Sequence, residues 1–94
     1  MMPEKKKAVV TVLGYDQKGI IAKVSAILYE CDVNILDISQ TIVAGLFNMV
    51  LVADVSSPAC SFDALSKHLS DLGEELGIQI RIQLSEIFEA MHQI

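Results

Sequence analysis

The residues best suited to chemistry lie in one short loop, Gly14-Tyr15-Asp16-Gln17-Lys18-Gly19, which precedes a helical pattern. Glycine has no Cβ, so another group can approach the backbone closely there. The amides of Gly19, Ile20 and Ile21 would be unsatisfied donors at the start of the helix, where the helix dipole also favours an anion. Such donors suit a carboxylate, while Asp16 can accept a hydrogen bond from an ammonium or hydroxyl group. Together these groups would form a receptor for a free amino acid.

The same loop has a simpler interpretation, in which it is only a turn. Asp16 would then cap the helix and Gly19 would supply the turn conformation, since the loop lacks the G-x-G-x-x-G pattern of nucleotide-binding folds. Asn34, which follows the predicted helix, is either a turn residue in the left-handed conformation or a hydrogen-bonding group for a ligand held between subunits. From the residue types and their spacing, both interpretations stay open.

The other reactive residue types lack the spacing that catalysis or metal binding requires. Cys31 and Cys60 form no C-x-x-C pair, which gives little support to a disulfide, a zinc site or a redox centre. Cys31 lies on the apolar stripe of a predicted helix, where a buried, inert thiol is expected. His68 and His92 have no metal-spaced partner. We therefore predict no catalytic residue, no metal and no cofactor, and a protein that is not an enzyme.

Composition argues against several classes of function. The 94 residues carry a net charge of −5, from 12 acidic and 7 basic side chains, whereas nucleic-acid binding needs a basic surface. No apolar run reaches the roughly 18–20 residues of a membrane span, and the charged start does not resemble a signal peptide. We expect a cytoplasmic protein that binds neither nucleic acid nor membrane. An apolar fraction of 52% exceeds what one small core needs, which favours a subunit interface.

The periodicity of the apolar residues predicts the elements that position the loop. We predict strands over 8–13, 35–42, 46–55 and 78–84, and helices over 19–30 and 61–77. The first and third strands are apolar on both sides, which is typical of central strands. The order βαββαβ predicts an α/β (α+β) ferredoxin-like fold, a four-stranded antiparallel sheet with both helices on one face. The other face would need a partner, so we expect a homodimer.

These elements form a single domain over residues 8–85, between two short tails. Residues 1–7 are expected to be a charged N-terminal tail. Residues 86–94 are expected to form a short C-terminal helix that packs back through Ile87, Met91 and Ile94.

The loop and the second strand together resemble the ACT domain family. Residues 12–24 resemble the opening of an ACT domain, a strand followed by G-x-D-[RK]-x-G-[IL]-[ILV] and a helix, with Gln17-Lys18-Gly19 where many relatives read Arg-Pro-Gly. Asn34-Ile35-Leu36-Asp37 resembles the family's N-I-x-[DE] strand entry. Over about residues 8–85 the chain is similar to stand-alone ACT proteins of bacteria and archaea, which are related to the regulator of the glycine cleavage system.

This resemblance implies a regulatory module that binds an amino acid at a subunit interface. It implies a homodimer or higher homo-oligomer that binds a free amino acid or similar zwitterion and controls an unidentified partner protein. The ligand-binding residues that it implies are Gly14, Asp16, Lys18, Gly19 and Ile20, with Asn34 and Ile35 contributed across the interface. The absence of the family's proline is expected to loosen the loop. The alternative is a structural or protein-interaction module of the same fold with no small-molecule ligand.

Overall fold

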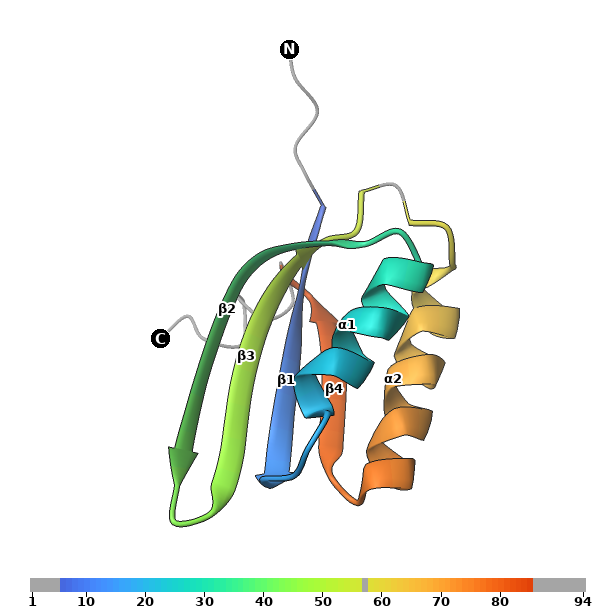
Figure 1. Cartoon of the computed structure of the whole chain (residues 1–94). Helices are drawn as coiled ribbons and strands as arrows, with labels where there is room; N and C mark the ends of the chain where they lie inside the picture. Colours follow the sequence, from blue (N-terminus) through green and yellow to red (C-terminus); the bar gives the residue numbers. More distant parts are fainter. Residues whose placement is uncertain (1–5, 57, 86–94) are drawn as a thin grey trace.

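The structure is a computed structural model of the chain, described for residues 6–56 and 58–85 (Figure 1). Its elements are β1 (Lys7–Tyr15), α1 (Ile20–Glu30), β2 (Asn34–Val43), β3 (Leu46–Asp54), α2 (Phe62–Leu76) and β4 (Gln79–Leu84). The predicted order is confirmed, and each bound lies within two residues of its prediction. The C-terminal helix predicted over 86–94 lies outside the described residues.

The strands form one antiparallel sheet in the order β2-β3-β1-β4. The two strands that are apolar on both sides, β1 and β3, are the central ones, as predicted. Both helices lie on the same face of this sheet (Figure 1). The ferredoxin-like fold predicted from the order of elements is therefore confirmed.

The core lies between the helices and the face of the sheet that they cover. Alternate side chains of β1 and β3 point into it, including Val10, Val12, Met49 and Leu51. The apolar faces of both helices pack against these strands through Val24, Leu28, Leu65 and Leu69. Burial of these apolar side chains is the main force that holds the helices to the sheet.

Two connections explain where the elements begin and end. The β2–β3 hairpin turns at Ala44 and Gly45, both with positive φ (52° and 80°), as a two-residue hairpin loop of this kind requires. After α1, the residue in the left-handed conformation is Asp32, with φ 55°. Asn34 is already the first residue of β2. The interpretation of Asn34 as a left-handed turn residue is therefore wrong, because the turn is completed two residues earlier.

The two cysteines are paired in a disulfide, which the spacing in the sequence did not indicate. Cys31, at the end of α1, is joined to Cys60 in the loop before α2, with the two Cα atoms 5.0 Å apart. The amide of Ala59 also donates a hydrogen bond to the carbonyl of Cys31 at 2.8 Å. The expectation of an inert buried thiol at Cys31 is wrong, because the fold brings these two segments together.

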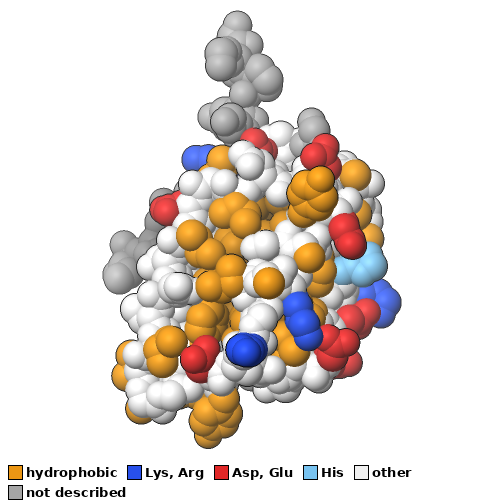
Figure 2. All heavy atoms as spheres, viewed as in Figure 1, with side chains coloured by type: hydrophobic (Ala, Val, Ile, Leu, Met, Phe, Trp, Pro, Cys, Tyr) orange, Lys and Arg blue, Asp and Glu red, His pale blue; other side chains and the backbone are white. Residues whose placement is uncertain are grey.

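Strand β2 is an edge strand that the helices leave largely uncovered. Ile38 and Ile42 pair with Leu51 and Phe47, which places both on the helix side of the sheet. They are nevertheless 42% and 58% exposed. Figure 2 shows apolar side chains in a band down this face of the molecule. A long edge strand with exposed apolar residues is a ready site for pairing with another chain.

The opposite face of the sheet carries no helix and is partly apolar. Leu13, Leu46 and Val50 are exposed there, so the second apolar registers of β1 and β3 point away from the core, as predicted. Among the described residues, no helix has the length and apolar character needed to cross a membrane.

Candidate functional site

The loop between β1 and α1 consists of residues 16–19, and all four are exposed. The amide of Asp16 donates a hydrogen bond to the carbonyl of Gly45 at 3.0 Å. On the other side, Nε2 of Gln17 donates to the carbonyl of Leu76 at 2.9 Å. The loop is thus held between the β2–β3 hairpin and the end of α2. These two anchors act in place of the proline whose absence was expected to loosen it.

The N-terminus of α1 has no side-chain cap. Its N-cap residue is Gly19, and no side chain of the described residues accepts a hydrogen bond from its first turn. The first turn also contains no acidic residue. The interpretation in which Asp16 caps the helix is therefore wrong. The first amides of α1, among them that of Ile20, are left as donors in a positive dipole field, which favours an anion.

The two glycines of the loop region have different surroundings. Gly19 has φ 86°, and a Cβ built on it would meet only Cε of Lys23, at 3.9 Å. A Cβ built on Gly14 would instead collide with Ile78. Gly19 therefore leaves open space in front of the helix amides, whereas Gly14 is required by packing within the chain.

Charged side chains of both signs lie on this loop and on the first turn of α1. Asp16 and Lys18 are exposed on the loop itself. Nζ of Lys23, one turn into α1, lies 3.8 Å from Oε2 of Glu75 in an exposed pair. An exposed pair of this kind contributes little to stability, so Lys23 can turn toward a bound anion at small cost. The loop can therefore face a carboxylate and an ammonium group at the same time.

Asn34 and Ile35 lie at the other end of the sheet from the loop. Asn34 pairs with Asp54, which pairs with Lys7 at the start of β1, whereas the loop follows Tyr15 at its end. The separation is about 26 Å, at roughly 3.3 Å per residue of strand. Figure 1 likewise shows the two connections at opposite ends of α1. One chain does not bring the predicted ligand-binding residues together, and Asn34 can meet a loop only from a second copy.

Two hollows in the described surface lie away from the loop, and sequence reasoning did not find them. One, of about 280 Å³, is on the helix-free side and is lined by Thr11, Val12, Leu13, Asn48, Gln79 and Arg81. The other, of about 340 Å³, is lined by Lys6 just before β1 and by residues of β4, α2 and the loop before α2. Their lining residues come from separate segments, so no local pattern in the sequence indicates them. Within residues 6–56 and 58–85, no group of three or more His, Cys, Asp or Glu could hold a metal ion.

The family model of the ACT domain matches residues 6–83, almost the whole chain. The chain therefore belongs to the ACT domain family, whose members are regulatory, ligand-binding modules rather than catalytic ones.

Among its relatives is a UPF0237 protein of Bifidobacterium longum, 48% identical over 88 residues, which are 94% of this chain and 98% of the relative. A solved ACT domain protein from Streptococcus pneumoniae is 39% identical with a TM-score of 0.77, over 95% of this chain and 100% of that chain. The regulatory subunit of aspartate kinase from Thermus thermophilus is 21% identical with a TM-score of 0.64, over 85% of this chain and 52% of that chain. This last likeness shows the fold alone.

Proposed function

We propose that this protein is a homodimeric sensor of a free amino acid, or of a similar zwitterion, and that it controls a partner protein in the cytoplasm without catalysing a reaction. The observation that carries the proposal is the uncapped N-terminus of α1 behind Gly19, with open space in front of it. A helix N-terminus with no side-chain acceptor favours a carboxylate, because its first amides are free donors and the helix dipole attracts an anion. The exposed carboxylate of Asp16 supplies the opposite charge for an ammonium group.

In this proposal the ligand lies against the backbone of Gly19 and Ile20. Its carboxylate accepts hydrogen bonds from the first amides of α1, and the ammonium of Lys18 adds a favourable charge. Its ammonium group contacts Asp16. Charge-assisted hydrogen bonds of this kind are stronger than neutral ones, and together they select a molecule that carries both charges.

The second subunit enters through β2. Antiparallel pairing of two β2 strands about a two-fold axis places Asn34 of one chain beside Val43 of the other. Val43 pairs with Leu46, which pairs with Tyr15 at the end of β1, so this is the end of the sheet that carries the loop. Asn34 and Ile35 of each subunit then approach the loop of its partner. The exposed side chains of Ile38 and Ile42 would be covered in the same contact.

Control of a partner protein is proposed by analogy with another protein of the same fold. The fold occurs in the regulatory subunit of aspartate kinase from Thermus thermophilus. A chain of this size that binds a ligand at a subunit interface changes the stability of the assembly, and a partner that recognises the assembled form can respond.

Calorimetric titration of the full chain with each of the twenty amino acids tests the ligand. We expect binding of one or a few of them, and its loss in Gly19→Ala, because a Cβ there strains the loop and occupies the open space. Gly77→Ala is the matched control, since Gly77 also has positive φ (71°) and also lies in open space. It should cost similar stability and keep the ligand. Silence across the panel at millimolar concentration would contradict the proposal.

A second function is favoured by the exposed apolar residues of β2 and the neighbouring strand. Ile38, Ile42, Val43 and Leu46 are all exposed, which suits a module that binds another protein with no small-molecule ligand. In that case Gly19→Ala would cost a little stability and leave partner binding intact. Loss of partner binding alone in that variant would exclude this alternative.

A further inference from the structure

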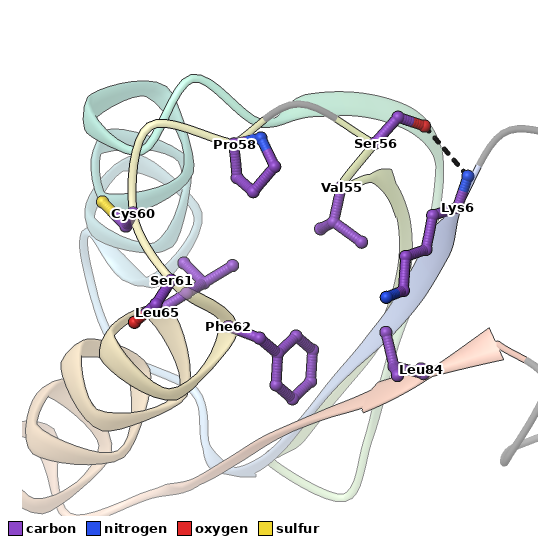
Figure 3. Close-up of a pocket in the computed structure, with 9 residues that line it drawn as sticks. All are labelled: Lys6, Val55, Ser56, Pro58, Cys60, Ser61, Phe62, Leu65 and Leu84. Carbon is purple, nitrogen blue, oxygen red and sulfur yellow. Dashed lines mark hydrogen bonds between the residues drawn. The ribbon is translucent and has the colours of Figure 1, made fainter.

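A cavity of about 340 Å³ lies at the end of the sheet opposite the β1–α1 loop, between the start of β1, the end of β4 and the start of α2 (Figure 3). Its volume is within the range of about 300–1,000 Å³ that is usual for small-molecule sites. The residues that line it are Lys6, Val55, Ser56, Pro58, Cys60, Ser61, Phe62, Leu65 and Leu84. Nothing in the proposed amino-acid site uses any of them.

Most of the cavity wall is apolar. Leu65 is 1% exposed and Val55 is also buried, so both belong to the inner wall of the cavity. Phe62 and Leu84 are half-buried and lie toward the same end of the cavity in Figure 3. Such walls favour an aliphatic or aromatic group, since each methylene taken from water contributes about 0.8 kcal/mol.

Lys6 is the one charged residue among those that line the cavity. Both polar groups of its backbone are hydrogen-bonded. Its amide donates to Oγ of Ser56 at 2.9 Å, and its carbonyl accepts from the amide of Val55 at 2.8 Å. Figure 3 shows its side chain running along the cavity, with the ammonium inside the ring of lining residues and near Leu84. An ammonium in such a place attracts an anion and, since no acidic residue lines the cavity, discriminates against a second cation.

Two serine hydroxyls add polar groups to the same cavity. Oγ of Ser56 accepts from the amide of Lys6, and Oγ of Ser61 accepts from the amide of Ala64 at 3.1 Å. A hydroxyl group that accepts a hydrogen bond keeps its own proton to donate. In Figure 3 neither hydroxyl points at the Lys6 ammonium, so Lys6 is the group that would hold an anion, and the two serines are polar groups at the rim of the cavity.

The cavity is built on fixed elements. The loop that carries Cys60 is joined to the end of α1 by the disulfide with Cys31 and by the hydrogen bond from Ala59 to the Cys31 carbonyl. Ser61 fixes the start of α2 as its N-cap. Walls held in this way lose little entropy when a ligand binds.

From this geometry we propose that the cavity binds a small monocarboxylate with an apolar body, such as a short-chain fatty acid. The carboxylate is held by the ammonium of Lys6, and the apolar chain lies against Val55, Phe62 and Leu65. The site is distinct from the amino-acid site by position and by chemistry. It accepts an apolar anion, and a zwitterion would have to place its ammonium group against apolar side chains.

The first test measures affinity across a series of ligands with the full chain. Calorimetric titration with butyrate, hexanoate and octanoate should show affinity rising about fourfold per added methylene until the cavity is full. Hexanamide, which has the same chain without the charge, should bind at least about tenfold more weakly than hexanoate. A site of this kind should have a dissociation constant of about 1 mM or below. The proposal is overturned if none of the three acids binds at millimolar concentration and 10-fold molar excess.

The second test uses two neighbouring lysines. Lys6→Met removes the charge from the cavity and keeps most of the stem, and it should weaken hexanoate binding about tenfold or more. Lys7→Met removes the same charge from a residue that does not line the cavity, and it should leave hexanoate binding unchanged. Lys6→Arg should restore most of the affinity. Equal effects of Lys6→Met and Lys7→Met would overturn the proposal, because they would reduce it to a non-specific effect of net charge.

Two further variants test whether this site is independent of the amino-acid site and of residues 86–94. Gly19→Ala, which should abolish amino-acid binding, should leave hexanoate binding intact, so failure of either site is seen independently of the other. Removal of residues 86–94 should leave the affinity for hexanoate unchanged. If hexanoate binds only after that removal, the cavity belongs to the C-terminal segment of the chain, and the small-molecule proposal is wrong.

Discussion

Ile78 lies directly against Gly14, so that a Cβ built on Gly14 would be 2.6 Å from the Cβ of Ile78 and 3.1 Å from its Cα. Ile78 is fixed in turn, because it is buried and its amide donates to the carbonyl of Gly73 at 2.9 Å. The end of β1 and the start of β4 can therefore approach this closely only with glycine at position 14.

We predict that Gly14→Ala destabilises the protein by about 1–3 kcal/mol, because the added methyl group overpacks a site whose neighbour cannot move away. Urea unfolding at 25 °C measures the change in the free energy of unfolding. Ser39→Ala, at an exposed position of β2, is the control and should change it by about 0.5 kcal/mol or less. If Gly14→Ala is as mild as the control, the close packing of Ile78 on Gly14 does not exist in solution.

The Cys31–Cys60 disulfide joins residues 29 positions apart and should stabilise the oxidised protein. A loop of that length corresponds to about 3–4 kcal/mol in the chain-entropy description. We predict that a dithiol reductant lowers the urea midpoint of the native chain. The double variant Cys31→Ser with Cys60→Ser should match the reduced protein and show no response to the reductant. A native chain whose midpoint is unchanged by reductant would show that the disulfide does not form.

Ser61 caps α2 through the hydrogen bond from the amide of Ala64 to its Oγ at 3.1 Å. We predict that Ser61→Ala costs about 1 kcal/mol of stability, since the alanine cannot accept that hydrogen bond. Ser70→Ala, at an exposed position inside the same helix, is the matched control and should be neutral or slightly stabilising, because alanine is the better helix former. Thermal unfolding of both variants measures the difference. Equal melting temperatures would contradict the role of Ser61 as a cap.

The fold could be predicted from the sequence because each element has its own local signal. Apolar residues on both sides of β1 and β3 indicated central strands, and the alternation at 78–84 indicated an edge strand. Ser61 and Gly77 marked the ends of α2, and both act there as caps. These signals depend only on neighbours in the chain, so they could be interpreted without any tertiary contact.

The features that the sequence did not predict depend on contacts between distant segments. Cys31 and Cys60 are adjacent only because the end of α1 meets the loop before α2. The sequence predicts that Gly14 leaves space for an approaching ligand, but the group that lies against it is Ile78 of the same chain. The cavity beside Lys6 has no local pattern for the same reason, since three separate stretches of the chain build it. The residues of the amino-acid site other than Gly14 keep their predicted roles as a proposal.

The exposed face of β2 should be the contact between subunits. We predict that the native chain sediments at twice the mass of one chain at micromolar concentration. Ile38→Lys with Ile42→Lys should convert it to a monomer, because two ammonium groups would have to be buried in the contact. Ser70→Lys, which adds a charge to an exposed position of α2, is the control and should remain a dimer. A native chain at the mass of one chain would contradict the predicted homodimer.

Loss of the dimer should affect the two proposed ligand sites differently. Asn34 lies about 26 Å from the loop of its own chain, given roughly 3.3 Å per residue of strand, so it can reach an amino acid only from the partner. The Ile38→Lys, Ile42→Lys variant should therefore lose about tenfold or more in amino-acid affinity, since it removes hydrogen-bonding groups that only the second subunit supplies. Its affinity for hexanoate should be unchanged, because all residues that line the Lys6 cavity belong to one chain. If both affinities fall together, the substitutions have damaged the fold, and if the amino-acid affinity is retained, the site is complete within one subunit.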